Sequence, residues 1–317
     1  MYKGVIIMID TTKLDYKGWS NSYNITNKKI ELIVLADVGP RIIRYGFVDG
    51  INQFVEFPEH SGLVGEDVWR IYGGHRLWHS PENINRTYYP DNHTVDVYKR
   101  ENGLILVQQE ETSTKLQKII EIEMDHETGA VTIIHRIKNC SLWDIKLSAW
   151  AISAMAPGGL SILKQRSHNY DDICIPDMRI SIWPKTSIKD RRVIWGEEYI
   201  LIKQDSCAQR SFKIGVSSDV GWVAYANDRN LFIKYYEYDS NSQYPDFGSS
   251  VELYTCDRFS EIETLSPLRI VTPGNEILHK EIWRVFKIEK TINELLDEEI
   301  LNSYIIPIVQ KNSLKSL

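Results

Sequence analysis

The 317-residue sequence has few cysteines and no long apolar run, and each absence excludes a class of protein. Its four cysteines, Cys140, Cys174, Cys207 and Cys256, are far apart and show no CxxC spacing, which argues against a disulfide framework and a cysteine-ligated zinc site. No segment approaches the roughly 18 apolar residues of a membrane-spanning helix. The apolar run at 5–8 is too short for a signal-peptide core. We therefore expect a cytoplasmic protein with no membrane partner.

The chain also lacks an excess of basic charge. The chain has 37 Lys and Arg against 43 Asp and Glu, a formal net charge of -6, and the basic residues are scattered. Because no basic stripe or Arg-rich arm is present, the sequence predicts no nucleic acid partner. The hydrophobic fraction of 43% and the charged fraction of 25% are ordinary for a globular protein.

Turn residues separate many short runs that are rich in β-branched and aromatic residues. Gly39-Pro40 divides two such runs, and Asn102-Gly103 is typical of a hairpin turn. Residues 116–125 alternate apolar and polar side chains, as half-buried strands do. Strands are expected in the ranges 29–47, 103–111, 116–125, 129–139, 143–155, 221–227, 231–238 and 249–256, with two more in 260–288 on either side of Pro273-Gly274.

This spacing of strands predicts the fold class. Strands at short intervals favour an antiparallel sandwich or barrel over alternating β-α-β units. Only residues 291–309 show helical spacing of apolar side chains, and no linker or internal repeat divides the chain. We predict an all-β protein with one large antiparallel domain over residues 1–317 and a short C-terminal helix at 291–309.

Aromatic residues are abundant, with nine Trp and seventeen Tyr. Aromatic rings with polar tips suit sugar recognition, because the ring packs on C–H groups while neighbouring polar groups bind the hydroxyls. An open sheet face needs such residues if it holds a polar ligand. The alternative is that most of these rings fill the core.

Two carboxylates stand out in the segment SEIETLSP. Glu261 and Glu263 point to the same side of an extended strand, about 7 Å apart. Their mutual repulsion would raise the pKa of one of them, which suits a general base. A solvated strand edge carrying charges for solubility is the alternative, and Glu121 and Glu123 repeat the pattern without catalytic residues around them.

The segment YGGHRLWHSPE, residues 72–82, concentrates titratable and aromatic side chains. In a helix His75 and His79 would share a face near Glu82, as metal ligands can. The preceding Gly-Gly and the following Ser-Pro instead indicate a loop, so we expect no metal site. In a loop, His75 can act as a proton donor and Arg76 can bind an anion or hydroxyl. His79 is then either a second proton donor or an ordinary loop residue.

Two further segments, TYYPDNHTV (87–95) and QYPDFGSS (243–250), repeat a Tyr-Pro-Asp element. Pro-Asp pairs usually form turns. The alternative is that both segments border one cleft, which would bring Asp246 to a ligand.

The assembled motifs resemble the galactose mutarotase-like superfamily, and more narrowly an uncharacterised bacterial family within it. The resemblance covers most of the chain, and the motifs are specific only together. It implies a β-supersandwich whose open sheet holds a carbohydrate. The motifs are YKGWSNSYNITN, LADVGPRIIRYGF, YGGHRLWHSPE, TYYPDN, HRIKN, LSAWAISAMAPGG, QYPDFGSSVELYT and EIETLSPLRIVTPGNEILHKEIW.

The resemblance also implies roles for residues. In aldose mutarotases a C-terminal glutamate deprotonates the anomeric hydroxyl, and Glu263 in IETLSP is the best match, with Glu261 next. The motif GGHRLW makes His75 and Arg76 the candidates that hold the sugar. In aldose mutarotases a histidine protonates the ring oxygen. Trp150 stands at the position of that histidine in this sequence, so the resemblance implies that His75 or His79 would have to replace it. The predicted catalytic residues are Glu263 and His75, and the predicted substrate-binding residues are Arg76, Trp78, His79, Glu82, Trp150, Asp246 and Glu261.

Three functions follow from this set. The first is an aldose 1-epimerase-like enzyme, which needs only proton transfers and hence no cofactor. The second is a carbohydrate-binding or sensing protein that kept the cleft and lost the chemistry, as the tryptophan at the acid position suggests. The third is a lyase or hydrolase acting on an oligosaccharide. All three have a carbohydrate as the partner.

Overall fold

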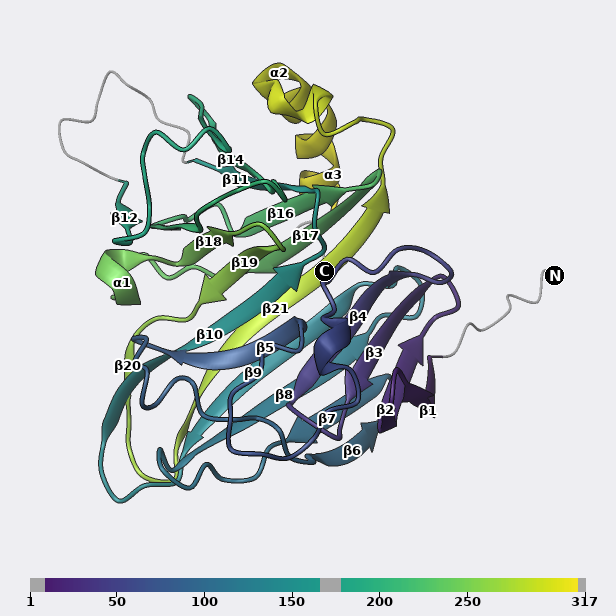
Figure 1. Ribbon diagram of the computed structural model, residues 1–317, viewed down its shortest axis with the longest axis vertical. Helices are drawn as coiled ribbons and strands as arrows, with labels where there is room; N and C mark the ends of the chain where they lie inside the picture. The colour runs from purple at the N-terminus through teal and green to yellow at the C-terminus, as the bar shows by residue number, and fades with distance from the viewer. Residues whose placement is uncertain (1–8, 166–177, 313–317) are drawn as a thin grey trace.

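A computed structural model describes residues 9–165 and 178–312, and these form two large antiparallel sheets packed face to face (Figure 1). Cys174 and the apolar run at 5–8 lie outside the described residues. Cys140, Cys207 and Cys256 are free thiols. The all-β sandwich predicted from strand spacing is confirmed.

The first sheet has 11 strands, and every neighbouring pair is antiparallel. Its centre, β5-β10-β19-β18-β15, joins segments far apart in the sequence. The order is β1 (Asp10–Tyr16), β2 (Trp19–Thr26), β3 (Ile30–Leu35), β4 (Arg41–Phe47), β5 (Gly74–Ser80), β10 (Ile145–Met155), β19 (Ser260–Leu265), β18 (Val251–Thr255), β15 (Phe212–Val216) and β12 (Ile180–Ile182), with β20 (Arg269–Val271) paired to β10.

The second sheet has 10 strands and packs against the inner face of the first. The predicted hairpin at Asn102-Gly103 is confirmed, since it connects β6 to β7. The order is β13 (Val193–Trp195), β14 (Tyr199–Lys203), β11 (Leu160–Lys164), β16 (Trp222–Asn227), β17 (Asn230–Tyr236), β21 (Glu276–Lys287), β9 (Val131–Asn139), β8 (Leu116–Met124), β7 (Gly103–Val107) and β6 (Asp96–Arg100).

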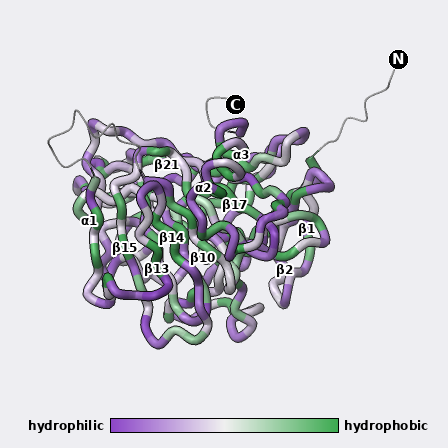
Figure 2. The backbone as a smooth tube through the Cα atoms, turned by 90° about the horizontal axis from the view of Figure 1, so that it is seen from above, coloured by the Kyte–Doolittle hydropathy of each residue, from purple (hydrophilic) through white to green (hydrophobic). Residues whose placement is uncertain are grey.

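Helical segments are few and short. The predicted short C-terminal helix is confirmed: after the turn η2, the segments α2, η3 and α3 follow one another without a break. They cover the outer face of the second sheet near β17 (Figure 2), where Tyr235 donates a hydrogen bond to the carbonyl of Val309. No helix among the described residues is long and apolar enough to cross a bilayer. The segments are η1 (Pro58–His60), α1 (Pro245–Gly248), η2 (Glu294–Leu296), α2 (Glu298–Ile300), η3 (Leu301–Ile305) and α3 (Ile306–Lys311).

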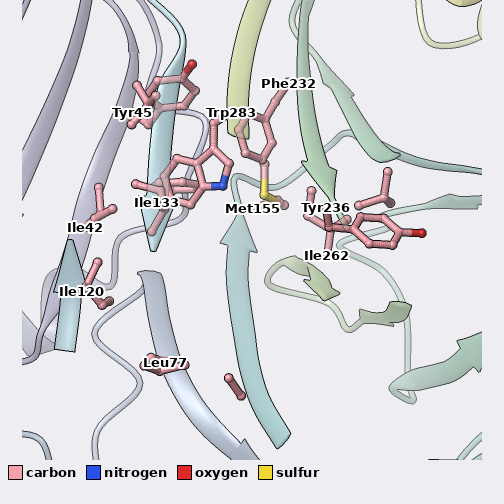
Figure 3. Close-up of a cluster of buried hydrophobic side chains, with 14 of the residues drawn as sticks. Ile42, Tyr45, Leu77, Ile120, Ile133, Met155, Phe232, Tyr236, Ile262 and Trp283 are labelled. Atoms are coloured by element: carbon pink, nitrogen blue, oxygen red, sulfur yellow. The ribbon is translucent and has the colours of Figure 1, made fainter. Parts of the chain in front are cut away.

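The main core lies between the two sheets and has an aromatic centre (Figure 3). The Trp283 ring packs edge-on against Phe54 and Phe232, with ring centroids 5.5 Å and 5.7 Å apart, and Tyr45 joins the cluster 5.6 Å away. Each fully buried aliphatic or phenylalanine side chain contributes about 1.5–3 kcal/mol. This core covers the inner face of the first sheet, and its outer face is not part of this core.

Residues 74–80 are a strand, β5, and not the predicted loop. Gly73 and Gly74 adopt positive φ angles of 97° and 70° and turn the chain into the strand, which begins at Gly74. All seven residues of β5 are buried. Because both faces of the strand are covered, its polar side chains were not a sign of solvent exposure.

The segment 260–288 also differs from the prediction. It forms three strands, β19, β20 and β21, where two were expected. The chain leaves β19 at Leu265, and Ser266 and Pro267 lead into the short β20, which pairs with the start of β10. The break falls at Pro267, because proline has no N–H to continue a ladder of hydrogen bonds.

Candidate functional site

The outer face of the first sheet carries most of the predicted binding residues. β5, β10 and β19 are adjacent (Figure 1), and β10 pairs with both neighbours so that Trp150 lies opposite Trp78 on one side. Alternation along each strand then places Arg76, Trp78 and Trp150 on the same face as Glu261 and Glu263. Strand pairing thus gathers side chains separated by up to 187 sequence positions.

A pocket of about 170 Å³ lies on this face. Five of the predicted residues line it, and three aromatic rings form one wall, with Trp78 packed 5.5 Å from Trp150 and 4.7 Å from Tyr88. The lining residues are Trp69, Ile71, Arg76, Trp78, Glu82, Tyr88, Trp150, Ile152, Lys185, Lys213, Tyr254, Phe259 and Glu261. An aromatic wall beside charged groups is suited to a polar ring-shaped ligand.

Arg76 and Glu261 form a buried ion pair in the wall of the pocket. Nη2 of Arg76 donates to Oε1 of Glu261 over 2.9 Å, and the guanidinium carbon lies 4.6 Å from the Trp78 ring centre. Arg76 is 3% exposed and Glu261 8%. Among the described residues, Arg76 Nε and Nη1 and Trp69 Nε1 meet no hydrogen-bond acceptor. Buried donors without acceptors cost free energy, so the pocket favours a ligand that supplies oxygen atoms.

The Glu261 carboxyl is suited to proton transfer. Burial raises its pKa above the ordinary range, Arg76 opposes that rise, and Glu263 adds to it. A carboxyl with a raised pKa holds a proton more readily at neutral pH and acts as a stronger base once ionised. Glu261 therefore combines access to the pocket with the chemistry of a general acid or base.

Glu263, the predicted base, lies on the same face but does not line the pocket. Its side chain is fully buried. Its Oε2 atom accepts hydrogen bonds from Trp150 Nε1 at 2.7 Å and from Lys213 Nζ at 2.9 Å. Trp150, at the position where the resemblance expected the acid histidine, thus lines the pocket and donates to Glu263.

Lys213 links Glu263 to a third carboxylate. Its ammonium lies 2.7 Å from Glu252 and 2.9 Å from Glu263, and it packs 4.5 Å from the Trp150 ring centre. Burial lowers the pKa of Lys213, but the two carboxylates together raise it above its ordinary value. Burial raises the pKa of Glu252 well above its ordinary range, against the effect of Lys213. Lys213 is therefore a fixed positive charge in the lining of the pocket.

His75 faces the opposite way from Arg76, because neighbouring residues of a strand alternate sides. It is fully buried between the two sheets, with its ring centre 4.6 Å from that of Trp283. Burial lowers its pKa well below the ordinary histidine value. His75 thus does not reach the pocket that Arg76 lines, and the expected pairing of the two on one ligand is not met.

His75 instead belongs to a buried hydrogen-bonded chain. Nδ1 of His135 faces the carbonyl of His279 at 3.0 Å, and since a carbonyl only accepts, that nitrogen carries the proton. Nε2 of His135 is then an acceptor, and Nε2 of His75 donates to it over 2.7 Å. Nδ1 of His75 accepts from the Ser153 hydroxyl at 2.9 Å. Hydrogen bonds satisfy both nitrogens of both rings.

Three potential metal-ligating atoms, from His75, His135 and Glu281, lie within 4.8 Å of one another. The Glu281 carboxylate is nevertheless occupied by protein donors: Lys234 Nζ lies 3.0 Å from Oε1, and Trp283 Nε1 donates to Oε2 over 2.7 Å. The ammonium of Lys234 supplies the positive charge that a cation would bring. This cluster is therefore a saturated polar network within the core.

The other predicted residues fall in three places. His79 lies on the inner face of β5, where burial lowers its pKa to about 3. Glu82 lines the pocket and accepts a hydrogen bond from the Tyr88 hydroxyl at 2.6 Å. Asp246 lies outside the pocket lining, and its Oδ2 accepts from Ser80 at 3.2 Å, at the end of β5.

Sequence reasoning missed several residues of the pocket, including Lys185, Lys213 and Tyr254. Lys213 and Glu252 could have been found, because each is a charged residue inside an otherwise apolar strand, in FKIGV and VELYT. A buried charge needs a partner, so two such strands predict a pairing. Lys185 follows the short strand β12 and carries no comparable pattern.

Comparison with known proteins identifies the fold. No protein-family profile matches the sequence, and no curated protein matches it. Among solved structures, a candidate aldose 1-epimerase from Klebsiella pneumoniae has a TM-score of 0.57 at 10% identity, covering 93% of this chain and 87% of the other. A galactose mutarotase-like protein from Lactobacillus casei has a TM-score of 0.56 at 10% identity, covering 84% and 100%. A candidate aldose 1-epimerase from Escherichia coli has a TM-score of 0.53 at 12% identity, covering 84% and 99%. The chain thus has the galactose mutarotase-like fold that its motifs predicted.

Proposed function

We propose that the pocket on the outer face of β5, β10 and β19 binds a carbohydrate and carries out acid–base chemistry at its anomeric carbon. The observation that carries this proposal is the ion pair of Arg76 and Glu261 in a pocket walled by Trp78 and Trp150. Aromatic faces pack on the C–H groups of a sugar ring, and the unpartnered donors of Arg76 bind its oxygens. The shared fold with candidate aldose 1-epimerases supports the choice of reaction.

In the proposed reaction Glu261 replaces Glu263 as the base, because Glu261 lines the pocket. The Glu261 carboxylate takes the proton of the anomeric hydroxyl, a C=O bond forms at the anomeric carbon, and the bond from that carbon to the ring oxygen breaks. The ring oxygen takes a proton from the Lys185 ammonium. Lys185 lines the pocket, and its ammonium lies 5.0 Å from the ring centre of Tyr254, which also lines it. Rotation about the adjacent C–C bond and reversal of the steps give the other anomer.

The test is the rate of anomer interconversion, measured by polarimetry and by NMR exchange over a panel of aldoses. We expect Glu261→Gln to lower the rate about 10²–10⁴-fold, the usual contribution of a positioned acid or base. Glu127→Gln is the matched control, since the Glu127 side chain is 79% exposed. A wild-type rate no faster than buffer for every sugar would refute the enzymatic proposal, as would full activity in Glu261→Gln.

A second candidate is a carbohydrate-binding protein without turnover. Trp150 favours it, because this residue stands where the resemblance expected an acid histidine and it hydrogen-bonds Glu263 instead of presenting a proton donor to a ring oxygen. Calorimetry separates the two candidates: sugar binding without interconversion supports this second function. Arg76→Gln should weaken binding in either case.

A further inference from the structure

A second hollow adjoins the pocket, and Tyr88 lies in the wall of both. The second hollow has a volume of about 260 Å³, against about 170 Å³ for the pocket. Tyr88 belongs to the segment TYYPDN, which no part of the proposed reaction uses and which also supplies Tyr89 and Pro90 to the second hollow. The two spaces therefore meet at one aromatic side chain.

The position of Tyr88 is fixed from the pocket side. Its ring centre lies 4.7 Å from that of Trp78 and 5.2 Å from that of Trp69, and its hydroxyl donates to Glu82 over 2.6 Å. Three separate contacts hold the ring, so it is a defined wall for a ligand on either side.

The second hollow is polar and aromatic and almost uncharged. Among the described residues that line it, Asp67 carries the one carboxylate, and none is Lys or Arg. The Tyr89 ring is held in place at its hydroxyl, which accepts a hydrogen bond from the Thr112 backbone N–H at 3.3 Å. The lining residues are Asp67, Asn85, Tyr88, Tyr89, Pro90, His93, Thr112 and Ser113. Rings beside hydroxyl, amide and imidazole groups suit a neutral sugar ring and offer no cation to an anionic group.

The volumes of the two hollows also favour a ligand larger than one sugar ring. Small-molecule sites are typically about 300–1,000 Å³, and the pocket alone is smaller than this range. The two hollows together reach the range. A ligand that fills both must extend past Tyr88, which a single sugar ring in the pocket does not do.

We infer that the second hollow is a subsite for a second sugar ring, so that the ligand is a neutral disaccharide or a longer neutral glycan. One ring lies against Trp78 and Trp150, and the next lies past Tyr88 against Tyr89. This inference rests on the proposed carbohydrate function and adds to it the class of ligand.

The test is isothermal titration calorimetry with cellobiose, maltose and lactose beside glucose and galactose. We expect at least one disaccharide to bind about tenfold more tightly than either component sugar, which is about 1.4 kcal/mol. Tyr89→Ala and the milder Asn85→Ala should each remove most of that gain and leave monosaccharide affinity unchanged. Tyr98→Ala is the control, since Tyr98 is a 56% exposed tyrosine on β6 in the other sheet.

The outcomes separate the two proposals. Monosaccharide binding with no gain for any disaccharide overturns the subsite and leaves the proposed function standing. Equal weakening of both ligand classes by Tyr89→Ala and Asn85→Ala also overturns the subsite. Absence of binding by all five sugars overturns both proposals. Circular dichroism on each variant establishes that it is folded.

Discussion

Lys213→Met is the substitution for which the structure gives the most definite prediction. The ammonium lies 2.7 Å from Glu252 and 2.9 Å from Glu263, and all three side chains are nearly or fully buried. At an effective dielectric constant of about 20, each contact is worth about 6 kcal/mol of Coulomb attraction. Desolvation of the charges and repulsion between the carboxylates offset much of this. Breaking a buried ion pair typically costs about 3–5 kcal/mol, and we expect that loss at pH 7.5.

The assay is urea unfolding followed by tryptophan fluorescence, with Lys115→Met as the control. Lys115 lies 2.9 Å from Glu110, the same distance as one of the Lys213 contacts, but both side chains are about half exposed. Exposed pairs contribute about 0–1 kcal/mol, so the control should change little. The matched distance leaves burial as the difference between the two pairs.

A pH series adds a second criterion. Burial already raises the pKa of Glu252, and loss of Lys213 removes the group that opposes this rise. A carboxyl with a raised folded-state pKa binds a proton in the folded state first, so its effect on stability becomes less unfavourable as the pH falls toward the unfolded value. The cost of Lys213→Met should therefore be smaller at pH 5 than at pH 7.5. A cost below 1 kcal/mol at pH 7.5, or an equal cost at both pH values, would refute this reasoning.

Two further outcomes are expected. Burial lowers the pKa of His79, His135 and His279 to about 3, so in the unfolded chain these groups bind protons below about pH 6.5 that the folded protein does not bind. The free energy of unfolding should fall by up to about 1.4 kcal/mol per pH unit for each group as the pH drops below 6.5. Urea unfolding at pH 7.5, 6.5 and 5.5 measures this fall. A free energy of unfolding that does not change with pH would contradict the burial of neutral histidines. Trp150→Phe keeps an aromatic side chain but removes the 2.7 Å donor to Glu263, and should lower the free energy of unfolding by about 1.5–3 kcal/mol in the same assay; a change within error would mean that the hydrogen bond contributes nothing.

The strands of the sandwich could be predicted because one face of many of them is more exposed than the other. In β8 and β9 buried side chains alternate with less buried ones, and apolar residues occupy most of the buried positions, with Lys118, His135 and Asn139 as the exceptions. β5 has no such contrast, since all seven of its residues are buried. With no such contrast, the Gly-Gly before these residues and the Ser-Pro after them led to the prediction of a loop, and only knowledge of what covers each face could have identified the strand.

In the candidate site, too, some features follow from the sequence of one strand and others depend on neighbouring strands. Alternation within one strand was enough to place Glu261 and Glu263 on one face, and the structure agrees. Which of the two reaches the pocket depends on neighbouring strands. Lys213 on β15 and Trp150 on β10 bind Glu263, while Arg76 on β5 binds Glu261 at the pocket.

The sequence by itself determined the β architecture, the alternation of faces and the aromatic and charged residues available for a site. These are local properties, because the period of a strand and the chemistry of a side chain need no distant partner. Tertiary structure alone decided that His75 turns into the core while Arg76 meets Glu261, 185 positions later in the chain. Such contacts depend on strand order and register, which are set by the packing of both sheets at once.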